Sequence, residues 1–229
     1  MPPGRPAEFG RPSSAPVPAP PPPAAAPPDT SSPTRQAAPS GAGPLPGVCL
    51  ASLRAAGAVA EPAPAPDPGC AIEEPVRLTG LADPTEPGRT LALPDRPVVA
   101  CRFALAFFGW AGGVAGPVLK AGRSAGLKAI RTGPGFECRG RNRQAGAKLS
   151  AHGTGLALDI AGFEFADGTS FAIGGRHEPA TEAAMATIRT AACGWFTTVL
   201  GPGSDPFHAD HLHLDVMLHG SSDRYRICQ

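Results

Sequence analysis

Residues 150–159 read Ser-Ala-His-Gly-Thr-Gly-Leu-Ala-Leu-Asp, and the chain continues with Ile-Ala. From position 156 onward, large apolar side chains alternate with small or acidic ones, and a period of two is typical of a half-buried β-strand. The pattern predicts that Leu158 and Ile160 face the core, whereas Asp159 projects from the other face between two alanines. Two glycines just before the strand permit a sharp turn, from which His152 can fold back towards Asp159.

Taken alone, this segment equally fits an exposed edge strand with a solvated histidine. Residues 210–218 read Asp-His-Leu-His-Leu-Asp-Val-Met-Leu and alternate in the same way. They predict a last strand over 211–218, with His211, His213 and Asp215 on the face away from the core. A surface strand with incidental histidines is the alternative. We disfavour it because four of the six histidines fall in the last 22 residues and two independent motifs would have to coincide.

The two segments supply an imidazole, a carboxylate and a second imidazole. Proteins use this set of ligands to hold one catalytic zinc ion and to leave a fourth position open for water. The sequence therefore predicts a Zn²⁺ site that both strands help to build.

Both segments also resemble known families. The pattern Ser-x-His-x-x-Gly-x-Ala-x-Asp over residues 150–159 resembles the signature of the LAS metallopeptidases, which include D-Ala-D-Ala carboxypeptidases and dipeptidases, murein endopeptidases and the hedgehog signalling domain. A closer resemblance, over about Cys49 to Gln229, is to the bacterial extensin-like C-terminal domain. The segments that carry it are 138–139, 149–150, 159–163, 199–202, 208–215 and 225–228.

This resemblance implies that His152, Asp159 and His213 are the zinc ligands. It implies an α+β fold in which a small antiparallel sheet is flanked by helices, and the mixed order of the expected elements agrees with that class. The resemblance to the LAS metallopeptidases implies a zinc metallopeptidase of the D-Ala-D-Ala carboxypeptidase or murein endopeptidase type, with peptidoglycan stem peptides or other cell-wall material as its substrate.

The catalytic base has two candidates. Many LAS peptidases have a Glu three residues before the last ligand, where this chain has Asp210, and others have a His two residues before it, where this chain has His211. Strand parity places His211 on the metal face, whereas Asp210 points inward only if it lies in the preceding loop. We therefore favour His211. The missing Glu also leaves open a domain that contains zinc and cleaves nothing, a non-catalytic binding or structural module of the cell envelope.

Three arginines, Arg139, Arg141 and Arg143, precede the first motif. Arginine suits the recognition of a carboxylate or the stabilisation of an oxyanion. By position, Arg139 matches the arginine that assists catalysis in LAS relatives, and we expect the other two to lie in a solvated basic loop.

Two further residues each leave two alternatives open. Asp215 is either a group that fixes the tautomer of a ligand or a surface carboxylate, and His208 either lines the cleft or is solvated.

Composition divides the chain into a linker over residues 1–46 and one domain over residues 47–229. Sixteen of the 30 prolines precede Cys49, and this stretch contains a single aromatic residue, so it cannot bury a core and is expected to be disordered. Six cysteines spread over the domain predict three disulfides, whose pairing the sequence leaves open. Disulfides indicate the periplasm or a secreted protein, although no apolar export segment is visible after Met1 in this sequence. Reduced cytosolic thiols are the alternative.

The formal net charge of +1 and the lack of aromatic residues among the basic ones argue against nucleic-acid binding. No apolar run is long enough to predict a transmembrane span, and we expect a monomer.

The remaining secondary structure is predicted from local patterns. We expect one helix over 98–111, a second that begins at 116 and a third over 179–193. We also expect a strand over 127–131, a hairpin of 159–165 with 169–173, and a loop over 61–68.

Overall fold

The computed structural model of the chain describes residues 47–64, 69–121, 123–144, 146–220 and 224–229. The predicted linker over residues 1–46 lies outside this part of the chain, as do residues 65–68 of the expected loop. The α-helices are α1 (Val48–Ala55), α2 (Cys101–Trp110), α3 (Gly116–Lys120) and α4 (Pro179–Ala192). Shorter helical turns are η1 (Ala111–Ala115), η2 (Arg141–Arg143), η3 (Ala151–Thr154) and η4 (Pro206–His208).

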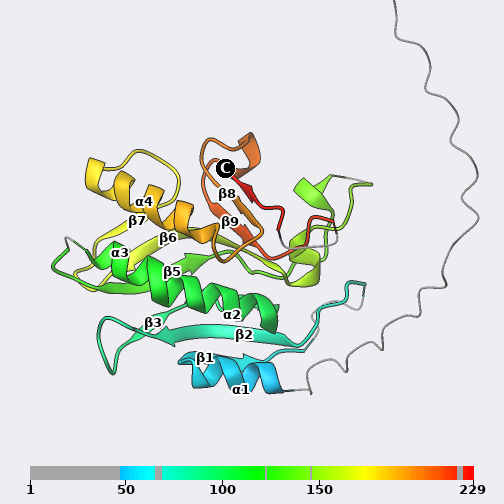
Figure 1. Cartoon of the computed structure of the whole chain (residues 1–229), viewed down its shortest axis with the longest axis horizontal. Coiled ribbons are helices and arrows are strands. Elements are labelled where there is room, and N and C mark those ends of the chain that lie inside the picture. The colour runs from blue at the N-terminus through cyan, green and yellow to red at the C-terminus, as the bar shows by residue number, and fades with distance from the viewer. Residues whose placement is uncertain (1–46, 65–68, 122, 145, 221–223) are drawn as a thin grey trace, which may run out of the picture. The chain divides into compact units, whose positions relative to one another are not determined.

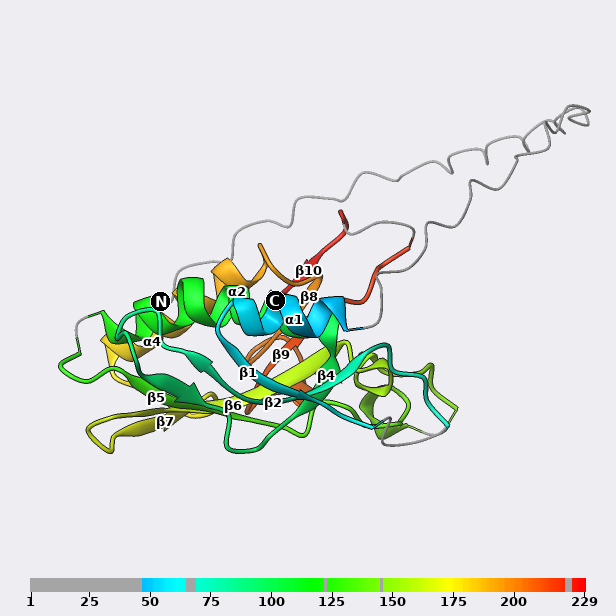
Figure 2. The same ribbon diagram turned by 90° about the horizontal axis from the view of Figure 1, so that it is seen from below.

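The strands form one mixed sheet. They are β1 (Ala58–Pro62), β2 (Pro75–Ala82), β3 (Thr90–Ala92), β4 (Val98–Ala100), β5 (Leu127–Thr132), β6 (Ala157–Phe165), β7 (Ser170–Ala172), β8 (Thr198–Leu200), β9 (Leu212–Asp215) and β10 (Ile227–Cys228). Their order is β1-β2-β3-β5-β6-β9-β8-β10, with β4 beside β2 and β7 beside β6. Helices α1, α2 and α4 lie over the same face of this sheet (Figures 1 and 2).

The α+β class is confirmed, but the small antiparallel sheet that the resemblance implied is wrong. Ten strands of the described part of the chain take part, and the pairs β3–β5 and β8–β10 are parallel. A parallel pair requires a crossover connection. Helices α2 and α3 provide it between β3 and β5, because they carry the chain back along the sheet before β5 begins.

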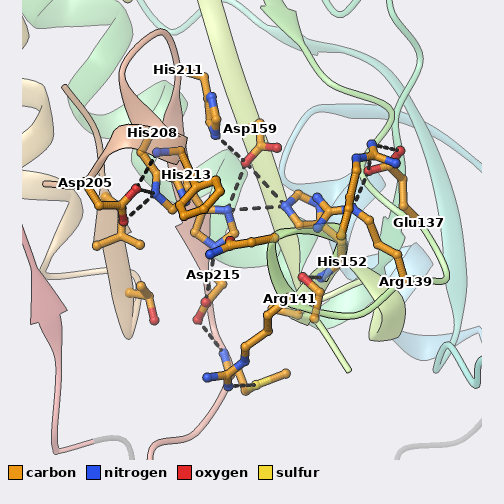
Figure 3. Close-up of a pocket in the computed structure, with 18 of the residues that line it drawn as sticks. Glu137, Arg139, Arg141, His152, Asp159, Asp205, His208, His211, His213 and Asp215 are labelled. Carbon is orange, nitrogen blue, oxygen red and sulfur yellow. Dashed lines mark hydrogen bonds and ion pairs between the residues drawn. The ribbon is translucent and has the colours of Figure 1, made fainter. Parts of the chain in front are cut away.

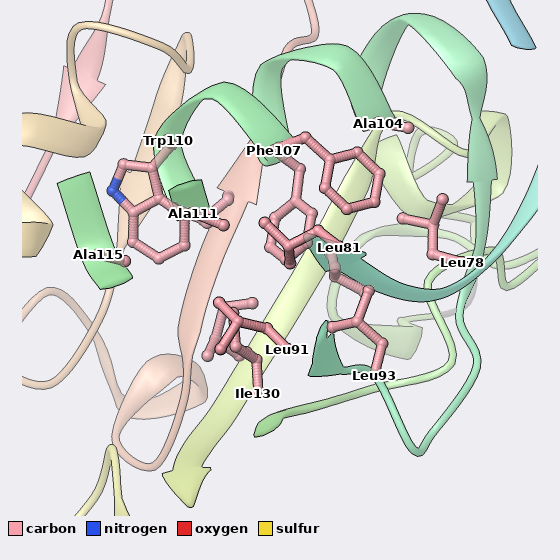
Figure 4. Packing of buried hydrophobic residues seen from close by; sticks show 14 of the residues in the cluster. Leu78, Leu81, Leu91, Leu93, Ala104, Phe107, Trp110, Ala111, Ala115 and Ile130 are labelled. Atoms are coloured by element: carbon pink, nitrogen blue, oxygen red, sulfur yellow. The ribbon is translucent and has the colours of Figure 1, made fainter. Parts of the chain in front are cut away.

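Helix α2 is the centre of the hydrophobic core. Phe103, Phe107 and Trp110 are completely buried, and they pack among leucines and isoleucines of the sheet (Figure 4). The indole nitrogen of Trp110 donates a hydrogen bond of 3.0 Å to the carbonyl oxygen of Ile188 on α4, so its polar atom is satisfied.

The described residues contain one helical run, Cys101–Lys120, that is long and apolar enough to cross a membrane, with a mean hydropathy of 1.3. Half of this run is buried inside the domain, where its aromatic side chains contact the sheet. The length and apolar character of this run are therefore explained by its place in the hydrophobic core.

Several expected elements are present with close boundaries. β5 and α4 lie where they were predicted, and β6 forms the expected hairpin with β7. Gly168 adopts a positive φ of 85° in the hairpin turn, and the carboxylate of Asp167 accepts hydrogen bonds from the amide and the hydroxyl of Thr169. Leu158 and Ile160 are completely buried, as their parity predicts.

Other expectations need correction. The helix expected from Val98 begins at Cys101, because residues 98–100 pair with β2 as β4. The helix expected from Gly116 continues α2 through the π-helical turn η1. The strand expected over 211–218 is shorter, Leu212–Asp215 (β9), and it is not the last, because β10 follows. After β9 the Asp215 carboxylate accepts a hydrogen bond from the Met217 amide, and Leu218 is half exposed. Part of the expected loop over 61–68 belongs to β1.

All six cysteines form disulfides, as predicted: Cys49–Cys101, Cys70–Cys138 and Cys193–Cys228. The first joins α1 to α2, and the last ties the C-terminal strand β10 to the end of α4. Cys70–Cys138 holds the segment that leads to Arg139. Because each bond closes a long loop, each reduces the entropy of the unfolded chain and stabilises the fold by about 2–4 kcal/mol.

Replacing Phe107 by Ala is expected to lower the free energy of unfolding by about 3–5 kcal/mol, because a fully buried aromatic ring is lost and a cavity is left behind. Phe207→Ala is the matched control: its ring is 51% exposed, so the expected change is within about 0.5 kcal/mol. Chemical denaturation followed by fluorescence measures both. Equal effects of the two substitutions would contradict this description of the core.

Candidate functional site

His152, Asp159 and His213 converge on one point (Figure 3). The Oδ1 atom of Asp159 lies 2.9 Å from His213 Nδ1 and 3.3 Å from His152 Nε2, and the two ring nitrogens are 3.3 Å apart. Ligands of a tetrahedral Zn²⁺ with bonds of about 2.0–2.1 Å are separated by about 3.3–3.4 Å. The three donor atoms are therefore spaced to hold one metal ion of this size.

Strand pairing brings these residues together. Asp159 on β6 lies directly opposite His213 on β9 in the antiparallel register. His152 comes from the turn η3 just before β6, where the hydroxyl of Ser150 accepts a hydrogen bond from its amide. Gly155 links η3 to β6 with a positive φ of 68°, and a Cβ atom at this position would collide with the side chain of Ile72. The turn that aims His152 at the strand thus requires glycine.

Hydrogen bonds fix the tautomers of both histidines. His152 Nδ1 donates to the carbonyl oxygen of Gly135 at 2.7 Å, and this bond leaves Nε2 as the atom directed at Asp159. His213 Nε2 donates to the carboxylate of Asp215 at 3.3 Å, which leaves Nδ1 as the atom beside Asp159. Asp215 is buried and also accepts a hydrogen bond from the hydroxyl of Thr197. Of the two roles considered for Asp215, its position fits the orienting one.

The electrostatics of the cluster favour a positive charge. Burial alone would raise the pKa of Asp159, but the hydrogen bonds and charges of His152 and His213 outweigh it and hold that pKa well below its usual range. Burial alone would lower the pKa of His213, but Asp159 and Asp215 raise it to about 9. The two carboxylates thus stabilise a cation between them, either a proton on His213 or a metal ion.

The two candidates for the base lie in different surroundings. His211 precedes β9 and places its Nε2 atom 3.7 Å from Asp159 Oδ1. Its Nδ1 atom lies 2.9 Å from the carboxylate of Asp210. The side chain of Asp210 is 86% exposed, so it points to solvent and reaches the cluster only through His211. The structure therefore brings His211 to the site and leaves Asp210 at its rim.

His208 also faces the cluster. Its ring centre lies 5.2 Å from that of His211 and 5.4 Å from that of His213. Both carboxylate oxygens of Asp205 lie 2.8 Å from His208 Nδ1. Burial lowers the pKa of His208 more than the hydrogen bond to Asp205 raises it, and the charges of His213 and His211 lower it further. Of the two alternatives for His208, the structure places it in the cleft.

Sequence reasoning missed Asp205. A signal was present, because Asp-Pro-x-His places an acceptor three residues before the histidine at the start of a helical turn. In η4 the carboxylate of Asp205 accepts a hydrogen bond of 2.7 Å from the amide of Phe207 and holds the ring of His208 as well.

The three arginines line the same cavity, which has a volume of about 530 Å³. Arg139 and Arg143 both contact the carboxylate of Glu137, at 2.8 Å and 2.7 Å, a pairing that the sequence did not reveal. Burial alone would raise the pKa of Glu137, but these two arginines lower it. Among the described residues, Arg141 contacts no carboxylate and lies 3.8 Å from the sulfur of Met217. The positive charge beside the cluster is thus partly neutralised at Arg139 and not at Arg141.

Metal binding at this cluster should weaken as the pH falls. His213 must lose its proton before Nδ1 can bind a metal ion, and its pKa in the folded protein is raised to about 9. Below that pH, the apparent affinity for Zn²⁺ should decrease by roughly tenfold for each pH unit. Competition with a chelating dye of known pH dependence, at several pH values from slightly acidic to slightly alkaline, measures this slope. An affinity that does not change over this range would mean that His213 is not a ligand.

Comparison with models of protein families matches residues 47–229 to the family described as the extensin-like protein C-terminus. No curated protein and no solved structure matches the chain. The relation to the LAS metallopeptidases therefore stays a prediction from the motif. Because the match covers the whole of the described domain, the chain belongs to the extensin-like protein C-terminus family.

Proposed function

We propose that this protein is a zinc-dependent peptidase that acts on the peptides of bacterial cell-wall peptidoglycan, in the periplasm or outside the cell. One observation carries the proposal. His152, Asp159 and His213 present three donor atoms 2.9–3.3 Å apart, and a hydrogen bond at the far nitrogen of each imidazole turns the other nitrogen towards the carboxylate.

The residues fit a resident Zn²⁺ ion. Two imidazoles and one carboxylate are the usual ligands of catalytic zinc, and this set leaves a fourth position for water or substrate. The fit is supported by the cation-stabilising charge of the cluster and by its place in the wall of an open cavity. Bound there, zinc would supply a Lewis acid that polarises a peptide carbonyl and makes water more acidic.

Histidines at the rim would handle the proton. Asp210 accepts the Nδ1 proton of His211, which leaves Nε2 as a base on the side of the cluster. Asp205 holds His208 in the same way, and the lowered pKa of His208 keeps its ring neutral at neutral pH. We assign the acceptance of a proton from water to His211 first, with His208 as the second candidate. Asp210 and Asp205 act as positioning residues.

The arginines would bind the substrate. Part of the guanidinium of Arg139 is engaged by Glu137, which fixes its plane beside the cluster and leaves other N–H groups to hold a carbonyl oxygen. Stem peptides of the cell wall carry free carboxylates, and a positively charged cleft suits them. This choice of substrate rests on the family resemblance and on the charge of the cleft. Three disulfides support an oxidising compartment.

A specific observation favours a second candidate, a non-catalytic zinc-containing module of the cell envelope. The glutamate of many LAS peptidases is replaced by Asp210, whose side chain is 86% exposed and directed away from the donor atoms. A fold that keeps its metal ligands and loses its base would still bind wall material without cleaving it.

Replacing His211 by Ala separates these candidates. If His211 is the base, the release of muropeptides from purified peptidoglycan should fall by about 10²–10⁴-fold, while zinc content and the unfolding temperature stay unchanged because His211 is not a ligand. Asp159→Asn should abolish both zinc binding and release. Asp167→Asn is the matched control, because this carboxylate lies in the β6–β7 turn, where it accepts hydrogen bonds from Thr169, and it does not line the cavity of the metal cluster.

Product release is followed by chromatography, with and without a chelator. A folded protein that contains zinc and releases nothing from any wall preparation would rule out the peptidase and leave the binding module. Full activity of His211→Ala would transfer the role of the base to His208.

A further inference from the structure

A second cavity, of about 500 Å³, lies at the other end of β6 from the metal cluster. It is formed by β7, by the loop after β7 and by the beginning of α4, elements that lie beside α3 at one end of the molecule (Figure 1). It shares no lining residue with the first cavity among the residues that the structure describes. We call it the α4 cavity and define it by Arg123, Arg176, His177 and Thr181.

Arg123 is held rigidly in the wall of the α4 cavity. Its guanidinium lies 4.3 Å from the ring centre of Phe165 and 5.8 Å from that of Phe171, distances at which a cation is attracted to an aromatic face. Its Nη2 atom donates a hydrogen bond of 2.9 Å to the hydroxyl of Thr181. No carboxylate within the described ranges lies close enough to form an ion pair with it, so most of its five N–H groups are available. Its charge also acts on Asp167, whose pKa is lowered by hydrogen bonds from Thr169 and further by Arg123.

Two more nitrogen-bearing side chains line the same space. Arg176 is exposed and forms neither an ion pair nor a hydrogen bond through its side chain with any described residue. The Nε2 atom of His177 is buried and has no hydrogen-bond partner. The ring stands edge-on to Phe171, and the amide of His177 is held by Glu182 at 3.1 Å. A buried polar atom without a partner is unfavourable, and a ligand oxygen that reaches it would remove this cost.

The start of α4 adds a positive potential, which the carboxylate of Glu182 in its first turn partly offsets. This helix has 14 residues and no side chain caps its N-terminus. Pro179 occupies the first turn, and the amides of Ala180 and Thr181 precede the first intrahelical hydrogen bond, which Glu182 donates to Glu178. Helix N-termini attract anions because their N–H groups and the helix dipole point the same way.

We propose that the α4 cavity binds a small anionic group, a carboxylate or a phosphate. Arg123 supplies the fixed planar donor, Arg176 closes over the anion from the solvent side, and His177 and the first turn of α4 complete its hydrogen bonds. Glu178 opposes this attraction, because its exposed side chain also lines the cavity. The site is independent of the zinc cluster and of any peptidase activity.

Titration with inorganic phosphate and, separately, with acetate tests the proposal on the full chain. The readout is the NMR signal of the His177 ring, assigned by comparison with His177→Gln. We expect a saturable shift with one or both anions: phosphate alone identifies a phosphate site, acetate alone a carboxylate site, and both a general oxyanion site. Arg176→Gln should weaken binding by about threefold or more, and Glu178→Gln should strengthen it.

Arg102→Gln is the matched control, because Arg102 is an exposed arginine of α2 that lines neither cavity. It should leave the affinity unchanged. Arg123→Gln should abolish binding. If this substitution unfolds the domain, because the guanidinium of Arg123 no longer packs on Phe165, the exposed Arg176→Gln variant still tests the site. The proposal is overturned if neither anion shifts the His177 signal at the highest soluble concentration, if only His152 and His213 respond, or if Arg176→Gln binds as tightly as the unaltered chain.

Discussion

The pairing of Asp159 with His213 across β6 and β9 is the contact on which the site depends. The two residues are direct partners in the antiparallel register, with Leu158 opposite Leu214 and Ile160 opposite Leu212 on the buried face. A slip of one residue would turn these aliphatic side chains to solvent and the carboxylate into the core. Hydrophobic burial therefore fixes the register, and the register fixes the distance between carboxylate and imidazole.

The rest of the domain holds this pair and the groups around it in place. Helix α2 packs its aromatic side chains on the sheet from one face, which leaves the polar face of β6 and β9 for chemistry. Around the donor atoms, the Gly135 carbonyl and the Asp215 carboxylate choose the tautomers of the two histidines. Carboxylates of Asp205, Asp210 and Glu137 orient the next histidines and arginines outward from the centre. Most of these side chains thus donate a hydrogen bond to a neighbouring acceptor that restricts their orientation.

Period-two patterns made the centre predictable, because parity alone separates Leu158 from Asp159 and Leu212 from His213. The strands between residues 58 and 100 were not predicted. β1, β3 and β4 have three to five residues each, too few to show a pattern, whereas β2 alternates from Val76 to Thr79 and its signal was missed. The pairing of Glu137 with Arg139 was equally invisible, because both lie in irregular backbone whose course depends on the Cys70–Cys138 bond. The mixed sheet likewise depends on a crossover that local patterns do not encode.

X-ray absorption spectroscopy of the zinc-loaded protein tests the central claim most directly, because it reports the atoms around the metal whether or not the protein is an enzyme. Ligation by His152, Asp159 and His213 predicts two imidazole nitrogens and one carboxylate oxygen at about 2.0–2.1 Å, a further light atom and no sulfur. The imidazole contribution should fall to one in His152→Ala. A shell of sulfur ligands, or a shell that is the same in both proteins, would contradict the assignment.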